Sequence, residues 1–424
     1  MDYVPNKNHE GFDELLRNKS YYYQNYIKST PFFVQYMDYM QLNENALIVT
    51  REPLAGASLS NLVRLLVQNR FKIDGRYMPR MLYATTISSL MTPLRIKEYL
   101  QFDKTIKKTE IPHHPIFILG HWRSGTTYLH NMLSLDTTLG YFSTFHASLP
   151  SVFLGSETLI KSFVASSLPK KRPMDDVPMG PALPQEDEFA LAAVSPYSAN
   201  HGLCFPSNAA YYNRFIFMED VPQKIIDEWK EIYRYLIQKE TLYSQGRQLV
   251  LKNPANTARV KLILEMFPEA KFIHIYRNPY HVYQSMLKLL LSIVPYMCVQ
   301  KPPKIAEVEQ QVLHVYKRMY TKYLKERAHI PKENLVEVRY EEFIQQPLEQ
   351  LNHMYTKLNL CGFEESEKKF ADYIETQAKV KKQKYLSDES VKEKIYTEWK
   401  FAFEAFHYKK APSGKYNERH LNHI

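Results

Sequence analysis

The chain has 424 residues, of which 45% are apolar and 24% charged, a balance typical of globular proteins. Its formal net charge of +10 predicts an anionic partner. The basic residues are dispersed, however, and none of the common nucleic-acid-binding motifs is present, so we expect no nucleic-acid partner.

The chain shows no sign of export or of a membrane span. Its first residues, Met1–Asn6, have neither the basic nor the apolar part of a secretory signal. The longest apolar stretch, Leu289–Val299, is interrupted by Ser292 and Pro295 and falls short of the roughly 18 residues that a membrane helix needs. We therefore expect a cytoplasmic protein without a transmembrane segment.

The three cysteines, Cys204, Cys298 and Cys361, stand far apart, and no Cys-x-x-Cys pair occurs. This spacing argues against a disulfide framework and against a zinc site. We expect inert, buried thiols.

Residues 1–110 are predicted to form a helical segment that packs on the rest of the protein. Apolar residues recur at helical spacing within Leu62–Val67 and within Met81–Leu90. We find no catalytic motif in this segment.

The stretch from Ile116 to Leu133 predicts a strand, a tight loop and a helix, in that order. Four apolar residues lie between Pro115 and Gly120, and apolar residues at helical spacing follow from Tyr128. Gly120 and Gly125 have the spacing of a phosphate-binding loop, but Thr126 stands where nucleotide triphosphatases have lysine. The cation lies inside the loop instead, as Arg123.

The next segments combine a short strand with a long insertion. Tyr141–Phe145 is aromatic and β-branched, which predicts a second strand ending at His146. Residues 147–247 are predicted to be an insertion that forms the acceptor pocket. Within it, Glu186 and Glu188 precede an apolar run, a pattern that serves equally well as a helix start or as a site.

Two later strands are predicted to end in basic residues. Gln248–Lys252 is followed by a helix over 256–267, and Phe272–Tyr276 is followed by Arg277, with Ser285 on the next helix. Side chains at the carboxyl ends of parallel strands reach the ligand crevice of an α/β fold. A later edge strand is predicted at Leu335–Val338, and residues 364–406 are predicted to be mostly helical.

These elements together predict an α/β fold, with a mostly parallel sheet flanked by helices as in phosphate-loop proteins, and with extra N-terminal and C-terminal helices. We expect a catalytic domain over residues 111–405 and a basic tail over 406–424.

Two motifs point to one family. Arg123-Ser124-Gly125-Thr126-Thr127 resembles the 5′-phosphosulfate loop of sulfotransferases that use 3′-phosphoadenosine 5′-phosphosulfate (PAPS), in the form found in bacterial and tyrosylprotein sulfotransferases. Ile275–Pro279, with Ser285 eight positions after Arg277, resembles the 3′-phosphate motif of the same family. The resemblance extends over roughly residues 111–405.

The resemblance implies transfer of a sulfonate group from PAPS to a hydroxyl or amine acceptor, and a role for each motif residue. We expect no metal. Arg123 and Lys252 would hold the sulfonate and the bridging oxygen, and Arg277 and Ser285 would bind the 3′-phosphate. The 5′-phosphate would lie against Ser124, Gly125, Thr126 and Thr127. Lys384, in the basic stretch Lys381–Tyr385, would close over the 3′-phosphate or belong to a solvated basic face.

The catalytic base is less directly indicated. Relatives commonly carry a glutamate where this chain has His146, and a histidine with a pKa near 6.5 can accept a hydroxyl proton at neutral pH. The alternatives for the base are Glu186 and Glu188.

Neither the acceptor nor the oligomeric state can be predicted from the sequence, and the acceptor classes left open are small molecules, lipids, glycans and peptides. Two other functions remain: a magnesium-dependent kinase or nucleotidase, and a non-catalytic anion-binding module. The missing loop lysine, and Arg277 where a strand-end aspartate would hold magnesium, weigh against the kinase.

Overall fold

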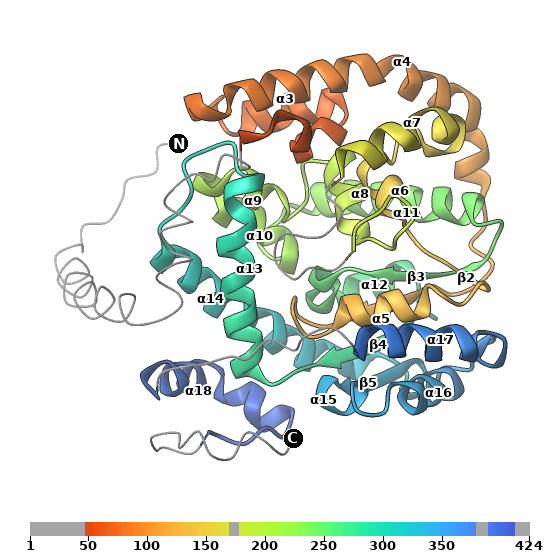
Figure 1. The fold of residues 1–424 in the computed structure, drawn as a ribbon, viewed down its shortest axis with the longest axis vertical. Helices are drawn as coiled ribbons and strands as arrows, with labels where there is room; N and C mark the ends of the chain where they lie inside the picture. Colours follow the sequence, from red (N-terminus) through yellow and green to blue (C-terminus); the bar gives the residue numbers. More distant parts are fainter. Residues whose placement is uncertain (1–46, 169–177, 379–388, 412–424) are drawn as a thin grey trace.

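Five short strands form one parallel sheet in the order β2-β3-β1-β4-β5 (Figure 1). The computed structural model describes residues 47–168, 178–378 and 389–411. The strands are β1 (Ile116–Leu119), β2 (Leu139–Gly140), β3 (Gln248–Lys252), β4 (Lys271–Tyr276) and β5 (Leu335–Arg339). The predicted parallel α/β fold is confirmed.

The central strand β1 is buried on both faces because alternate side chains enter different apolar clusters. Ile116 and Ile118 pack on one face of the sheet, whereas Phe117 and Leu119 pack on the other. In the register, Ile118 lies beside Lys252 of β3 and Ile273 of β4. The segments that follow these three strands therefore leave the sheet at the same edge.

Helices cover both faces of the sheet. The cluster containing Ile118 includes side chains from α5, α15, α16 and α17, while the cluster containing Phe117 includes α11 to α14 and α18. The helices are α3 (Leu59–Gln68), α4 (Met78–Lys108), α5 (Thr126–Leu133), α6 (Thr144–Ser148), α7 (Phe153–Ser167), α8 (Asp187–Val194), α9 (His201–Cys204), α10 (Ala209–Phe217), α11 (Gln223–Tyr243), α12 (Val260–Met266), α13 (Pro279–Met297), α14 (Ile305–Glu326), α15 (Tyr340–Phe343), α16 (Pro347–Lys357), α17 (Phe363–Ala378) and α18 (Glu389–Ala405).

Helices α3 and α4 lie along one outer edge of the molecule, and α15 to α18 lie at the opposite side (Figure 1). Ser58 caps α3 by accepting a hydrogen bond from the Asn61 N–H. Buried ion pairs tie α4 to its surroundings: Arg80 binds Glu52 at 2.7 Å, and Lys239 of α11 binds Glu98. Leu62 of α3 and Met81 of α4 belong to the same apolar cluster as Phe117.

The structure corrects three expectations. Tyr141–Phe145 is not a strand, because β2 ends at Gly140 and the Ser143 side chain accepts from the His146 N–H to begin α6. The helix expected over 256–267 is shorter: a 3₁₀ segment, Pro254–Ala258, precedes α12. Of the three cysteines expected to be buried, Cys361 is exposed.

Within the described ranges, no helix is both long enough and apolar enough to cross a membrane.

Replacing Ile118 with alanine tests the central position of β1. Ile118 is fully buried between α5 and the neighbouring strands. We expect Ile118→Ala to lower the free energy of unfolding in urea by about 2–5 kcal/mol, because a cavity remains in a packed core. The control, Val63→Ala at an exposed site on α3, should change it by no more than about 0.5 kcal/mol. A cost below about 1 kcal/mol for Ile118→Ala would contradict this assignment of the core.

Candidate active site

The loop between β1 and α5 depends on glycine at its end. Gly125 has a φ of 101°, in the left-handed region, and a Cβ there would lie 2.3 Å from Cδ2 of Tyr340. At the start of the loop, the Gly120 N–H donates to Oγ1 of Thr257 at 2.8 Å. Both ends of the loop are thereby fixed, and Tyr340 lies directly against it.

The first turn of α5 offers an anion site. No side chain caps this helix, and the first N–H groups of a helix have no acceptor within it. The positive end of the helix dipole also favours an anion at this point. Of the predicted loop hydroxyls, those of Ser124 and Thr126 belong to buried residues, while Thr127 is half-buried. Of these three residues, Thr127 is therefore the one most open to an anion that enters from solvent.

Three predicted binding residues meet beside this loop. The Nε of Arg123 donates to Oγ of Ser285 at 2.8 Å, and Nη1 of Arg277 donates to the backbone carbonyl of Arg123 at 3.2 Å. The guanidinium of Arg277 also lies over the ring of Tyr340, 4.4 Å from its centroid. The loop cation and the predicted 3′-phosphate pair thus form one cluster, although they lie more than 150 residues apart in the chain.

His281 is a further residue of this cluster that we did not single out from the sequence. It lies on α13, four residues before Ser285 on the same helix and four residues after Arg277, which precedes the helix. Burial and then the charge of Arg277 hold the pKa of His281 below its usual value, which favours the neutral ring. The four-residue spacing was the available signal.

Lys252 and Glu186 form an ion pair. Lys252 ends β3, and its Nζ donates to Oε1 of Glu186 at 2.6 Å. The lysine side chain is 2% exposed and the glutamate side chain 15% exposed. Glu186 occupies the N-cap position of α8 without capping the helix through its side chain. Its carboxylate is therefore both paired and reachable.

The two acids after Glu186 have different environments. Glu188 is buried and accepts from Arg259 at 2.8 Å, Asn253 at 2.7 Å and Ser198 at 2.7 Å. Burial alone would raise the pKa of Glu188, but the charge of Arg259 and the hydrogen bonds from Arg259, Asn253 and Ser198 together outweigh burial and hold the pKa below its usual value. Burial raises the pKa of Asp187 to about 6, and Tyr233 donates to its carboxylate at 2.6 Å. These contacts tie Asp187 and Glu188 into the packing around α8.

His146 lies on α6 and not at a strand end. Its Nδ1 is 2.9 Å from Oε2 of Glu240, and its ring stacks on Phe153 with centroids 4.3 Å apart. The ring of Tyr243 packs edge-on at 4.3 Å, and the histidine is buried. The structure therefore encloses His146 between α6, α7 and α11.

His130 was also not singled out. It is buried on α5, and burial followed by the charge of Lys252 holds its pKa well below the usual value. Lys384 lies outside the described residues. Among the residues that the structure describes, no three His, Cys, Asp or Glu side chains are grouped as a metal site would require.

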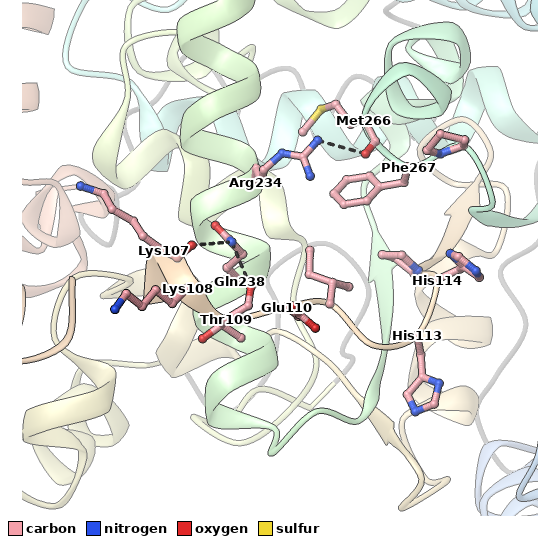
Figure 2. A pocket seen from close by; sticks show the side chains of 13 residues that line it. Lys107, Lys108, Thr109, Glu110, His113, His114, Arg234, Gln238, Met266 and Phe267 are labelled. Atoms are coloured by element: carbon pink, nitrogen blue, oxygen red, sulfur yellow. Dashed lines mark hydrogen bonds between the residues drawn. The ribbon is translucent and has the colours of Figure 1, made fainter. Parts of the chain in front are cut away.

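A hollow of about 410 Å³ lies at the other edge of the sheet, where β1 begins (Figure 2). Two of its polar side chains bond to other residues of the lining: Arg234 donates to the carbonyl of Met266, and Gln238 donates to the carbonyls of Lys107 and Thr109. The hollow lies away from the loop site, because Pro115, just before β1, is part of its lining. We assign the hollow no part in the chemistry.

The sequence of the chain matches the sulfotransferase family over residues 115–365, more than half of its length. The chain belongs to the sulfotransferase family and is a sulfotransferase. It is also 31% identical over 332 residues to the omega-hydroxy-beta-dihydromenaquinone-9 sulfotransferase Stf3 of Mycobacterium bovis and of Mycobacterium tuberculosis, an alignment that covers 78% of this chain and 84% of each relative.

Solved structures share the fold. The sulfotransferase STF9 from Mycobacterium avium superposes with a TM-score of 0.64 at 14% identity, covering 84% of this chain and 98% of that chain. STF1 from Mycobacterium tuberculosis gives a TM-score of 0.56 at 18% identity, covering 74% and 86%.

The loop predicts a strong effect of Gly125→Ala on activity. The added methyl group would clash with Tyr340, and alanine is strained at a φ of 101°. We expect sulfonate transfer to fall at least about 10-fold, because small displacements of a binding loop are costly in catalysis. Gly75→Ala is the matched control, since a methyl group added there would have no neighbour within 4 Å. Equal rates for the two variants would contradict this account of the loop.

Buried neutral histidines predict acid sensitivity. Burial lowers the pKa of His201 to about 4, against about 6.5 in an unfolded chain. Below pH 6.5 the unfolded state therefore binds a proton that the folded state does not, and the free energy of unfolding falls as the pH drops toward 4. His201 contributes up to about 1.4 kcal/mol per pH unit to this loss.

Urea titrations at pH 7, 6 and 5 measure this dependence. His201→Gln should lose less stability than the wild type between pH 6 and 5, whereas His329→Gln, at an exposed position, should follow the wild type. If the free energy of unfolding changes equally with pH in the wild type and in His201→Gln, His201 is protonated to the same extent in the folded and unfolded states.

Proposed function

We propose that this chain transfers a sulfonate group from PAPS to a hydroxyl group of a lipid-like acceptor. The observation that supports this proposal most is the cluster of Arg123, Ser285 and Arg277 beside the uncapped start of α5. It provides separate cationic and backbone sites for the several anionic groups of such a nucleotide.

The residues present fit the nucleotide. The cradle at Gly125 is closed to a side chain by Tyr340, which leaves the N–H groups at the start of α5, with Thr127, for the 5′-phosphate. Arg277 and Ser285 would bind the 3′-phosphate, with His281 beside them. Arginine suits this role because its planar guanidinium offers several donors to one phosphate.

When bound, the nucleotide supplies an activated sulfonate group. Lys252 and Arg123 would stabilise the negative charge that develops on the sulfonate and on the oxygen that leaves. We place Glu186 ahead of His146 as the base, because its carboxylate is partly exposed while His146 is enclosed by Glu240, Phe153 and Tyr243. Glu186 would accept the proton of the acceptor hydroxyl as its oxygen forms the new bond to sulfur.

The ion pair between Lys252 and Glu186 would couple charge stabilisation by the lysine to proton removal by the glutamate. In the structure the lysine charge is balanced by the glutamate at 2.6 Å. A nearby anion competes for the same ammonium group, and loss of the lysine contact raises the proton affinity of the carboxylate. Donor binding would therefore prepare Glu186 to act as a base.

The acceptor is proposed from the relative. The name of Stf3 describes a hydroxylated menaquinone as its substrate, and 31% identity extends over 84% of that protein. We therefore propose a hydroxyl on a long apolar molecule, ahead of glycans, peptides and small alcohols. The kinase and the anion-binding module are the competing functions, and each makes a different prediction: magnesium-dependent phosphate release, or polyanion binding that does not need Arg123.

Removing either proposed cation should abolish most of the transfer. With radiolabelled PAPS and an extract of apolar alcohols as acceptor, we expect Arg123→Ala and Lys252→Ala each to lower the rate at least about 100-fold, because each removes charge stabilisation in the transition state. Lys332→Ala, at an exposed lysine, should behave as the wild type. Near-normal rates in either site variant, with the fold intact, would make our assignment of that residue wrong.

The base is tested by comparing Glu186→Gln with His146→Gln. We expect Glu186→Gln to lower kcat by about 10²–10⁴ and to remove the acidic limb of the pH–rate profile, as loss of a general base does. His146→Gln should mainly lower the free energy of unfolding, because it breaks the buried contact with Glu240. The reverse pattern, with kcat lost only in His146→Gln, would restore His146 as the base.

A further inference from the structure

Helix α4 presents a stripe of exposed apolar side chains along one side. Leu82, Leu90 and Leu100 are 70%, 65% and 77% exposed, and Ile96 is 54% exposed. Positions 82, 86, 90, 93, 97 and 100 follow one another at steps of three or four residues, so they share one face of the helix. Isolated exposed apolar residues are common in proteins, but a row of this length on one helix face indicates an interaction surface.

The exposed face of the first part of α4 has no charged residue. Between Met78 and Ile96 the charged side chains are Arg80, which is buried, and Arg95, which donates to the carbonyls of Ser88 and Gly56. The remaining exposed positions include three hydroxyl residues, and each hydroxyl donates to the carbonyl four residues earlier. These bonds join Thr85 to Met81, Thr86 to Leu82 and Ser89 to Thr85.

This pattern suits a surface that meets an apolar medium. A hydroxyl that is satisfied within its own helix needs no water, so covering it with hydrocarbon leaves no polar group unpaired.

Helix α3 and the turn after it carry further exposed apolar side chains in the N-terminal region. Val63 and Val67 are exposed on α3, and Phe71 beyond its end is 64% exposed. Arg70 and Phe71 both have a φ of 53°, which is uncommon for residues other than glycine and a genuine outlier for a bulky side chain. The turn thus holds an aromatic ring in solvent between Arg70 and Lys72.

Positive charge borders these apolar residues. On the exposed stripe of α4, Lys97, Lys104 and Lys108 continue the same three- and four-residue spacing toward its end. Residues 59–110 contain ten lysines and arginines and four acids. Of these acids, Asp74 is paired with Arg76, Glu98 with Lys239 and Asp103 with Lys107.

We propose that α3, α4 and the turn between them dock on the surface of an anionic lipid bilayer. We define the outer apolar face by Val63, Val67, Phe71, Leu82, Leu90, Ile96 and Leu100. Apolar side chains enter the boundary between headgroups and acyl chains, and the bordering lysines and arginines meet anionic headgroups. The charge pattern favours a bilayer over a second copy of this chain, which would bring the same basic borders together.

This inference concerns binding and does not rest on the proposed reaction, but it gives that reaction a setting. A long apolar alcohol is found in a bilayer and not in water. A protein docked through the outer apolar face would lie at the surface where such an acceptor resides.

Vesicle flotation of the full chain, without nucleotide or acceptor, tests the proposal. The probes are vesicles of phosphatidylcholine with about 30% phosphatidylglycerol, and vesicles of phosphatidylcholine alone. We expect the wild type to float with the anionic vesicles and to bind less as salt is raised. The triple variant Leu82→Gln, Leu90→Gln, Leu100→Gln should lower the partition coefficient at least about tenfold, because three apolar side chains no longer leave water.

Control variants change the same residue types at sites outside the outer apolar face. Leu183→Gln changes an exposed leucine elsewhere and should bind as the wild type. Lys104→Gln with Lys108→Gln should weaken binding to anionic vesicles alone, whereas Lys332→Gln with Lys357→Gln, at exposed lysines far along the chain, should not. Each variant should still bind 3′-phosphoadenosine 5′-phosphate as the wild type does, which tests the donor site independently.

Two results would overturn the proposal. If the wild type stays in the aqueous fraction with anionic vesicles, the outer apolar face does not dock on a bilayer. If the leucine triple variant floats as well as the wild type, the vesicles are bound by a different surface. Light scattering of the same samples identifies a second copy, since the leucine variant would then shift from dimer to monomer.

Discussion

Positive charge gathered at one edge of the sheet is the constraint on which the rest of the structure depends. Arg123 follows β1, Lys252 ends β3 and Arg277 follows β4, so the three cations lie at the carboxyl ends of neighbouring parallel strands. The start of α5 adds the positive end of a helix dipole. These positive charges repel one another unless anionic or polar groups balance them. Where an incoming anion can displace those groups, the cations form a strong anion-binding site.

The counterparts seen here differ in kind. Lys252 is balanced by a carboxylate, Arg277 lies on the ring of Tyr340, and Arg123 donates to a hydroxyl. A carboxylate competes with an incoming anion, whereas a ring or a hydroxyl does so weakly. The pair of Lys252 and Glu186 is therefore a contact that binding of an anion would disturb. It is also the contact that would link donor binding to proton removal from the acceptor.

The buried polar network behind the site holds this edge in place. Glu188, Arg259 and Asn253 join α8 to the segment after β3, so the acid at the start of α8 is held beside the lysine at the end of β3. Breaking a buried pair of this kind leaves an uncompensated charge, which is strongly destabilising. In the proposed site, Glu188 would thus contribute through the position of Glu186.

The central strands and the loop could be predicted from the sequence, because short local patterns of residues specify them. The strands β1, β3 and β4 are short buried apolar runs, and the glycine spacing of the loop reflects backbone geometry that few sequences satisfy. The two-residue β2 is too short to leave a pattern, and α6 begins through the Ser143 cap, which outweighs the aromatic strand propensity of the segment.

The environments of single side chains could not be predicted from local sequence patterns. His146 is enclosed by Glu240, 94 residues away, and Glu186 meets Lys252 across 66 residues. No local pattern encodes such pairings, because the fold creates them.

The most direct test of the account is calorimetric titration with 3′-phosphoadenosine 5′-phosphate, with and without magnesium, compared with ATP and with adenosine 5′-phosphate. The account predicts binding that needs no magnesium, prefers the 3′-phosphorylated nucleotide by at least about 1.5 kcal/mol as a charge-assisted contact should, and loses that preference in Arg277→Ala. Equal affinity for the three nucleotides, or a preference that survives in Arg277→Ala, would contradict the claim that this cluster reads the 3′-phosphate.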